Sequence, residues 1–184
     1  MSFAIETERL LLREFAEDDW HDVHAYAADP EVVKFMDWGP NTEEDTKAFI
    51  ALAMDLQHQT PRRSYELAVV FKATGRLIGG ASLRVQAGDP RTAELGYTFH
   101  PGAWGRGLAT EAAKALVQFG FQRLGVQRVF ATCRPENTAS YRVLRKAGLH
   151  FEEYLQNVKI VRGQLVDAFL CGLAREEWAG PAST

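Results

Sequence analysis

The sequence predicts an α/β (α+β) fold, in which helices pack on the faces of one mixed sheet. Strand-like apolar runs and segments of helical periodicity follow one another in the order β-α-α-β-β-β-α-β-α-β-β. This order differs from the regular βαβ repeat of a wholly parallel sheet. A glycine-rich turn at residues 102–107 separates one strand from a helix, and no linker or internal repeat divides the chain. We therefore expect a single domain over residues 1–184.

The composition indicates a globular protein. Hydrophobic residues make up 46% of the 184 positions and charged residues 24%. The formal net charge of −3 gives no basic excess to bind nucleic acid or an anionic membrane surface. No apolar run approaches the roughly 18 residues needed to span a bilayer, and the N-terminus lacks a signal-peptide pattern. We expect a cytoplasmic protein.

Neither the cysteines nor the histidines are spaced as metal ligands. Cys133 and Cys171 stand singly in apolar segments, where cysteine acts as a small core residue. His21 and His24, three residues apart, are more typical of a helix surface than of a zinc site. We expect no bound metal.

The first third of the chain predicts one strand and two helices. Residues 9–15 form a short apolar run typical of a strand. Apolar residues at helical spacing follow from Trp20 to Ala27 and end before Asp29-Pro30. Residues 35–40 are an aromatic loop, and residues 41–44 resemble a capping box that begins a helix reaching about His58.

Three strands and the glycine turn occupy the middle of the chain. Two β-rich runs, 64–71 and 77–85, are joined by a hairpin turn, and a third strand is predicted over 93–99. Beyond the turn, Leu108 begins a helix with one apolar face.

The last third predicts a strand, a helix and a pair of strands. Residues 128–133 are strand-like, and Asn137 can cap a helix that Gly148 ends in a left-handed conformation. Two final strands, about 151–158 and 165–173, are separated by Arg162-Gly163.

A glycine turn between a strand and a helix is suited to an anion. Glycine lets the backbone approach a ligand, and unpaired N–H groups point outward from the start of a helix. The spacing of Gly105-Arg106-Gly107-Leu108-Ala109 lacks the third glycine of a dinucleotide fingerprint, and no acidic residue follows about 20 positions later. No Lys-Ser or Lys-Thr follows a glycine as in a Walker loop. The turn therefore predicts a diphosphate site of another kind.

The segment Trp104-Gly105-Arg106-Gly107-Leu108-Ala109 resembles the acetyl-CoA signature [QR]-x-x-G-x-[GA] of the GNAT superfamily of N-acetyltransferases, with Trp in place of Gln or Arg at the first position. That Trp and the Leu-Gly-Tyr upstream resemble the Rim-type branch, which contains ribosomal-protein N-terminal acetyltransferases. Three further segments support the resemblance, which covers about residues 5–178: Thr7–Arg13, Asn137–Ser140 and Arg175–Trp178.

The resemblance implies a GNAT-type fold, whose mostly antiparallel sheet splays between the strands at 93–99 and 128–133. Acetyl-CoA would lie in the splay as co-substrate. Its pantetheine would pair with backbone near Tyr97 to Phe99, and N–H groups of the turn would hold its pyrophosphate. The implied cofactor-binding residues are Tyr97, Thr98, Phe99, Trp104, Gly105, Arg106, Gly107, Leu108, Ala109, Thr110, Asn137 and Ser140.

Two residues are candidates for the chemistry of acetyl transfer, which needs a base for the amine and stabilisation of the departing thiolate. Glu94 lies in the strand beside the splay and shares a face with Gly96 and Thr98 by strand alternation. The resemblance implies that it is the base, although a solvated strand glutamate is an alternative. The family tyrosine acid is replaced here by Leu144, and the resemblance implies that Ser140 meets the CoA sulfur. A local backbone contact is the alternative for Ser140.

The acceptor amine is expected opposite the CoA, over the loop 35–41 and the turn 157–164. Phe35 and Trp38 could wall this pocket or pack the loop onto the sheet, and Asp37 could attract a cationic amine.

The predicted function is acetyl transfer to a primary amine. The leading candidate for that amine is the N-terminal α-amine of a protein or peptide. A small-molecule amine (aminoglycoside, polyamine or amino-acid analogue) and a non-catalytic acyl-CoA-binding module remain open. The resemblance also implies a possible homodimer.

Overall fold

The computed structural model describes residues 3–180 and contains the predicted mixed sheet. Its eight strands lie in the order β1-β2-β3-β4-β5-β6-β8-β7, and only the β5–β6 pair is parallel. The prediction of a mostly antiparallel sheet is therefore confirmed. The strands are β1 (Ala4–Glu6), β2 (Leu10–Glu14), β3 (Ser64–Phe71), β4 (Arg76–Val85), β5 (Thr92–Phe99), β6 (Arg128–Cys133), β7 (His150–Val161) and β8 (Gln164–Ala174).

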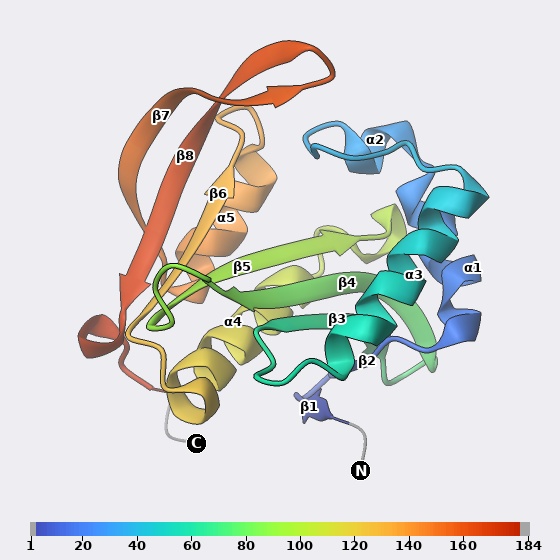
Figure 1. The fold of residues 1–184 in the computed structure, drawn as a ribbon, viewed down its shortest axis with the longest axis horizontal. Coiled ribbons are helices and arrows are strands. Elements are labelled where there is room, and N and C mark those ends of the chain that lie inside the picture. The colour runs from blue at the N-terminus through green and yellow to red at the C-terminus, as the bar shows by residue number, and fades with distance from the viewer. Residues whose placement is uncertain (1–2, 181–184) are drawn as a thin grey trace.

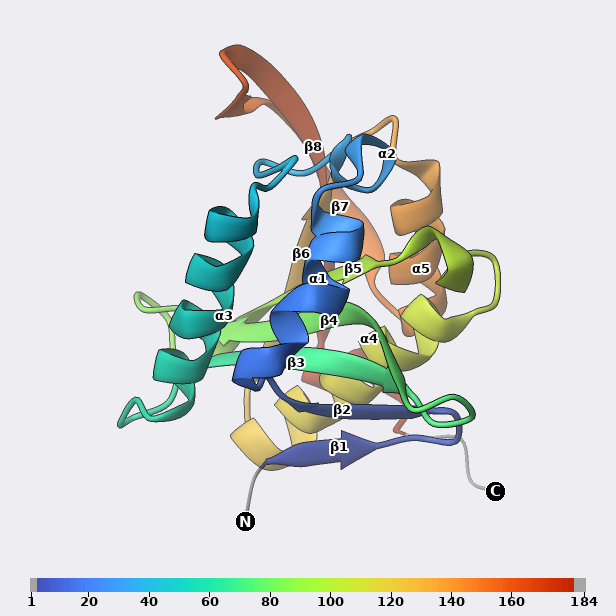
Figure 2. The same ribbon diagram turned by 90° about the vertical axis from the view of Figure 1, so that its right-hand side faces the viewer.

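Helices cover both faces of the sheet, as predicted (Figures 1 and 2). One buried cluster joins the sheet to α4 and α5, and a second joins the other face to α1 and α3. Along β3, Leu67 and Val69 belong to the first cluster while Ala68 belongs to the second, because successive side chains of a strand face opposite ways. The helices are α1 (Trp20–Ala27), α2 (Pro30–Val33), α3 (Glu43–Gln57), α4 (Leu108–Phe119) and α5 (Thr138–Ala147). Within residues 3–180, no helix is long and apolar enough to cross a membrane.

The sheet splays at the predicted place. β5 and β6 pair only over Thr92–Glu94 and Arg128–Phe130. Beyond this point β6, β8 and β7 rise away from β5 (Figure 1). The edge of β5 beyond Glu94 therefore has no strand partner among the described residues, and its backbone groups, apart from the Phe99 carbonyl, are available to a ligand.

Three features of the fold differ from the sequence prediction. Strand β1 was not predicted, because three residues are too few to show a pattern. Helix α2 was not predicted either: Asp29-Pro30 marks its start, with the Asp29 carboxylate accepting from the Glu31 N–H at 2.9 Å. Strand β7 runs to Val161, beyond the predicted end at Val158. Its end was missed because nearly all of its side chains are exposed, so buried and exposed positions do not alternate along it.

Candidate active site

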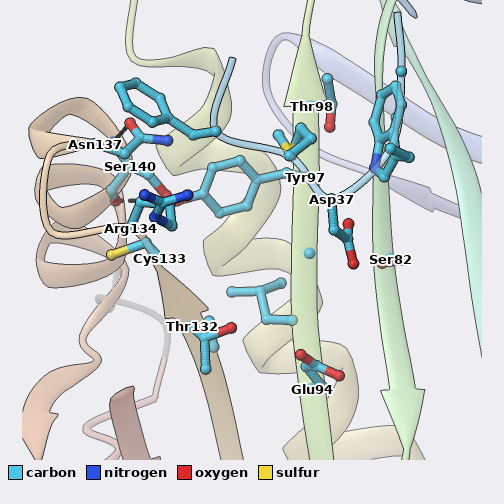
Figure 3. Close-up of a pocket in the computed structure, with 18 of the residues that line it drawn as sticks. Asp37, Ser82, Glu94, Tyr97, Thr98, Thr132, Cys133, Arg134, Asn137 and Ser140 are labelled. Carbon is cyan, nitrogen blue, oxygen red and sulfur yellow. Dashed lines mark hydrogen bonds between the residues drawn. The ribbon is translucent and has the colours of Figure 1, made fainter. Parts of the chain in front are cut away.

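A cavity of about 790 Å³ opens where β5 and β6 separate (Figure 3). It lies between the splay, with α5 on one side, and the loop that follows α2 on the other. The cavity brings together predicted residues from all three groups, catalytic, cofactor-binding and acceptor-binding. These residues are Phe35, Asp37, Trp38, Glu94, Tyr97, Thr98, Asn137 and Ser140. Phe99 and residues 104–110 lie outside its lining.

The glycine turn has the backbone geometry of an anion site. Gly105 and Gly107 have φ values of +72° and +76°, a left-handed region that favours glycine. The first hydrogen bond of α4 runs from the Glu111 N–H to the Gly107 carbonyl. The N–H groups of the preceding helical residues, Leu108 to Thr110, have no carbonyl within the helix to bind. These groups fit the pyrophosphate of a CoA cofactor.

The turn between β1 and β2 holds the glycine turn in place through Glu111. The Thr7 hydroxyl donates to Glu111 Oε1 at 2.6 Å, and the Arg9 N–H donates to the same oxygen at 2.9 Å. The Arg9 Nε–H donates to Oε2 at 2.7 Å, and its Nη1 donates to the Arg106 carbonyl at 3.1 Å. The segment Thr7–Arg13, which carried part of the family resemblance, thus supports the start of α4.

Replacing Glu111 with glutamine tests this support through its pH dependence. Burial alone would raise the pKa of Glu111, but hydrogen bonds from Thr7 and Arg9 and the Arg9 charge lower that pKa overall. Such a carboxyl stabilises the fold above its unfolded pKa of about 4.3, and the contribution is lost as the pH falls through the lower folded pKa. We expect Glu111→Gln to lower the free energy of unfolding by about 1–2 kcal/mol at neutral pH.

Urea unfolding at a series of pH values checks this expectation. The difference between wild type and Glu111→Gln should stay constant down to about pH 5 and shrink below about pH 4. Exposed Glu8 provides the control, and Glu8→Gln should leave the stability unchanged at every pH. A difference that does not depend on pH would contradict the role given to the Glu111 charge.

Trp104, at the first position of the signature, contacts the end of β5. Its indole N–H donates to the Phe99 carbonyl at 2.8 Å, while about half of the side chain is exposed. The carbonyl of Phe99 is therefore already engaged. Trp104 fastens the glycine turn to the strand that carries Glu94.

Glu94 faces the cavity and lies on the same side as Asp37 and Ser82 (Figure 3). Arg84 on β4 is its partner in the strand register, yet the Arg84 Nε–H donates to Glu66 Oε1 on β3 at 2.6 Å. That hydrogen bond, with the negative charges of Glu66, Glu94 and Asp37, raises the pKa of Arg84 despite burial. Within residues 3–180, Glu94 makes no hydrogen bond or ion pair, so its carboxylate is free to take a proton.

Asp37 comes from the loop after α2 and forms an ion pair with Lys159 on β7. Burial would raise the pKa of Asp37, but the hydrogen bond and charge of Lys159 lower that pKa overall, so the carboxyl is ionised near neutral pH. The contact joins two segments that are far apart in the sequence. Both line the cavity and form its wall opposite the splay.

Arg162, at the tip of the β7–β8 hairpin, strengthens this wall. Its Nη2 lies 3.1 Å from the Val33 carbonyl, 3.2 Å from that of Trp38 and 3.0 Å from that of Gly39. One guanidinium thus holds both the end of α2 and the loop that carries Asp37 and Trp38. The geometry of the predicted acceptor pocket depends on this contact.

Replacing Arg162 with alanine should loosen the acceptor wall, which is formed by the loop after α2 and by β7. The β5 edge and the glycine turn, where the cofactor is expected, should stay intact. We expect KM for the acceptor amine to rise about tenfold, since hydrogen bonds from a charged donor are lost, and KM for acetyl-CoA to stay unchanged. Steady-state kinetics with each substrate varied in turn measures both. Arg76, exposed at the start of β4 in another hairpin, is the control. Equal changes in the two KM values would contradict this role.

The side chain of Tyr97 connects β5 to α5 across the splay (Figure 3). Its hydroxyl has one hydrogen to donate and two acceptors in reach, the Ser140 carbonyl at 3.1 Å and the Ser140 Oγ at 2.9 Å. Asn137 caps α5, with its side-chain oxygen accepting from the Ser140 N–H at 3.0 Å, which leaves its amide NH₂ for a ligand. Leu144, at the position of the family tyrosine, is 1% exposed and packs in the core.

Sequence reasoning did not identify several polar residues of the cavity. Strand alternation could have placed Ser82 and Arg84 on the cavity face of β4. The other contributions come from tertiary contacts that leave no local pattern. The lining residues not identified include Glu66, Ser82, Arg84, Thr132, Arg134, Lys159 and Asp167, together with the hydroxyl of Tyr97. Arg162, which holds the wall without lining the cavity, was not identified either. Across residues 3–180, no cluster of three or more His, Cys, Asp or Glu side chains is placed to hold a metal ion.

Residues 9–150 match the acetyltransferase (GNAT) domain family, and the chain belongs to that family. It is therefore an acyltransferase that uses acetyl-CoA. It is 34% identical over 174 residues to the uncharacterized N-acetyltransferase YnaD of Bacillus subtilis (strain 168), covering 95% of this chain and 98% of YnaD. The crystal structure of a GNAT-family acetyltransferase from Bacillus anthracis superposes with a TM-score of 0.84, at 33% identity over 95% of this chain and 99% of that one.

A more distant likeness concerns the fold alone. RimL, the ribosomal L7/L12 alpha-N-protein acetyltransferase, superposes with a TM-score of 0.82, covering 95% of each chain at 19% identity. The TM-score shows that the two proteins share the fold. It does not show a common acceptor.

Proposed function

We propose that this enzyme, a single domain over residues 1–184, acetylates the N-terminal α-amine of a protein or peptide. The amine attacks acetyl-CoA directly while both substrates are bound. The observation that carries this proposal is the free carboxylate of Glu94 in a cavity that continues into the splay. Such a carboxylate can accept the proton of an ammonium ion, directly or through a water molecule.

The remaining catalytic and cofactor-binding roles are proposed as the family resemblance implies them. Ser140 would donate a hydrogen bond to the thiolate that leaves, and the Asn137 amide would contact the pantetheine. The edge of β5 at Tyr97, Thr98 and Phe99 would pair with the pantetheine backbone. The segment from Trp104 to Thr110 would hold the pyrophosphate through its N–H groups.

The charges of the cavity favour an acceptor with a single ammonium group. Asp37 is paired with Lys159 and Glu66 with Arg84, whereas Glu94 has no partner among the described residues. Apolar side chains such as Phe35, Trp38 and Val158 line the same cavity. A peptide N-terminus, with one charged amine beside an uncharged chain, fits this lining. The fold shared with RimL is consistent with the Rim-type branch.

A small-molecule amine is the second candidate, because one of the chain's relatives is named for a polyamine acceptor. The chain is 28% identical over 157 residues to the spermidine N(1)-acetyltransferase of Escherichia coli (strain K12), with 85% of this chain covered. A polyamine would place further positive charges in the cavity, where most carboxylates already have partners. Polyamines are therefore the weaker form of this alternative, and amino-acid analogues the stronger.

A thiol-release screen tests the proposal. The purified protein is incubated with acetyl-CoA and a panel of N-terminal peptides, amino-acid analogues, aminoglycosides and polyamines, and free CoA is measured. We expect release that depends on a peptide with a free α-amine and not on the same peptide blocked by acetylation. Release with small amines alone would favour the second candidate. Acetyl-CoA binding without release for any amine would favour a non-catalytic module and refute the proposal.

We also propose that the chain forms a homodimer through the β7–β8 hairpin. This hairpin exposes large apolar side chains: Phe151, Tyr154, Val158, Ile160 and Leu165. Exposed apolar patches of this kind are typical of protein–protein interfaces. Sedimentation velocity over a range of concentrations tests the proposal, and a monomer at every concentration would refute it.

A further inference from the structure

The hydroxyl of Tyr97 lies beside Ser140, although the family's usual tyrosine position is occupied here by Leu144. Tyr97 reaches from β5 to the first turn of α5, and its Oη is 2.9 Å from the Ser140 Oγ. The contact spans 43 positions in the sequence, so it depends on the packing of α5 against the splayed sheet. Both residues line the cavity next to Asn137.

The surroundings of Tyr97 keep its hydroxyl protonated and fixed. Burial raises the pKa of Tyr97, and the hydrogen bond with Ser140 opposes this only in part. The hydroxyl therefore carries a hydrogen throughout the neutral range. It has two acceptors within reach, the Ser140 carbonyl at 3.1 Å and the Ser140 Oγ. The backbone of Ser140 is held in turn by the side chain of Asn137.

We propose that Tyr97 is a positioning residue that aims the Ser140 hydroxyl at the sulfur of the departing CoA. The inference rests on the proposed function. Without a partner, a serine hydroxyl rotates among three staggered positions, and its hydrogen would bond with the helix backbone or with water. When Tyr97 donates to the Oγ, that acceptor position is filled and the Ser140 hydrogen is free to point into the cavity.

The bonds of the transfer step balance without any further reactant. Glu94 first takes one proton from the acceptor ammonium ion and passes it to solvent. The neutral amine nitrogen then forms the new C–N bond, and its second proton passes to Glu94. The C–S bond breaks and its electron pair remains on sulfur as a thiolate. Ser140 donates a hydrogen bond to that thiolate while Tyr97 donates to Ser140. Tyr97 and Ser140 keep their protons, and solvent protonates the thiolate after release.

Kinetics of four variants test the coupling between the two hydroxyls. We expect Tyr97→Phe to lower kcat about tenfold, the effect of losing one hydrogen bond to a charged group, with KM for acetyl-CoA unchanged. Ser140→Ala should have an effect at least as large. In the double variant, removing the Tyr97 hydroxyl should cause no further loss. Tyr141→Phe is the matched control: Tyr141 also lies on α5 and packs edge-on against Phe169, and kcat should not change.

A second measurement does not need turnover. The pKa of the CoA thiol, bound to each variant, is measured from the ultraviolet absorbance of the thiolate. We expect it to be higher in Tyr97→Phe and in Ser140→Ala than in wild type, by about one unit, which corresponds to the same tenfold factor. Arg134 lines the same cavity but is present in every variant, so its contribution cancels.

Two results would overturn the inference. One is an unchanged kcat and thiol pKa in Tyr97→Phe with a wild-type unfolding midpoint. The other is an equal loss from Tyr97→Phe with and without Ser140, which would mean that Tyr97 acts on its own. If Tyr97→Phe does not fold, the thiol pKa in Ser140→Ala decides, and an unchanged value refutes the inference. A wild type that acetylates no amine would refute the proposed function, while the thiol titration would still test Tyr97.

Discussion

Glu94→Gln is expected to lower kcat by about 10²–10³-fold, within the range found for the loss of a general base. Glutamine keeps the size of the side chain but cannot accept the proton of an ammonium ion. Because Glu94 lies on the cavity side of β5, away from the glycine turn, the dissociation constant for acetyl-CoA should be unchanged. Steady-state kinetics and calorimetric titration measure the two quantities.

The pH dependence of the variant provides a further check. A free amine needs no base, so the deficit of Glu94→Gln should shrink as the pH rises through the pKa of the acceptor amine, about 8 for an N-terminus. Glu153→Gln is the matched control, since Glu153 is an exposed carboxylate on β7 outside the cavity. A kcat equal to that of wild type would show that Glu94 is only a solvated strand residue.

Gly79→Ala is expected to lower the free energy of unfolding by about 3 kcal/mol, near the upper end of the usual cost of overpacking. A Cβ at Gly79 would lie 2.4 Å from the Thr98 carbonyl and 3.0 Å from the Phe99 Cα. These are backbone atoms of β5, so no side-chain rotation can relieve the contact. The strands β4 and β5 must move apart, and the movement reaches the strand that carries Glu94 and Tyr97.

Urea unfolding of both glycine variants measures this effect. Gly88→Ala is the control, because a Cβ there has no heavy atom within 4 Å and its φ lies outside the left-handed region. The control should differ from wild type by less than about 0.5 kcal/mol. If Gly79→Ala were as stable as Gly88→Ala, the close approach of β4 and β5 would not be what excludes a side chain at position 79.

Local signals in the sequence were sufficient for most of the elements. The start of α4 at Leu108 was predicted from apolar periodicity, and the left-handed end of α5 at Gly148 was predicted from the glycine itself. The left-handed conformation of Gly107 was not predicted. A capping box does begin α3, but it lies one residue later than predicted, with Thr42 and Asp45 at its ends instead of Asn41 and Glu44. The splay followed from family resemblance and not from periodicity, since nothing in either strand shows where their pairing stops.

The loop 35–41 and the turn 157–164 were expected to flank the acceptor, but the side-chain contacts that shape the cavity could not be predicted, because each joins residues distant in the sequence. Arg162 is an unremarkable turn residue until the hairpin tip meets the carbonyls of α2, 129 positions earlier. Tyr97 was predicted to offer only its backbone, and its hydroxyl gains a partner through the packing of α5. The sequence shows that position 144 carries no tyrosine. It does not show that Tyr97 on β5 brings a tyrosine hydroxyl to Ser140.

The contact of Arg162 also has a consequence for the order in which the site is completed during synthesis. The ribosome makes α2 and the loop that carries Asp37 early, whereas residues 159 and 162 emerge near the end of the chain. A nascent chain that stops after α5 already contains the glycine turn, Glu94 and the Tyr97–Ser140 pair. It lacks the residues that hold the acceptor wall. The acceptor wall can therefore form only after the final hairpin has been made, so it is among the last parts of the site to be completed.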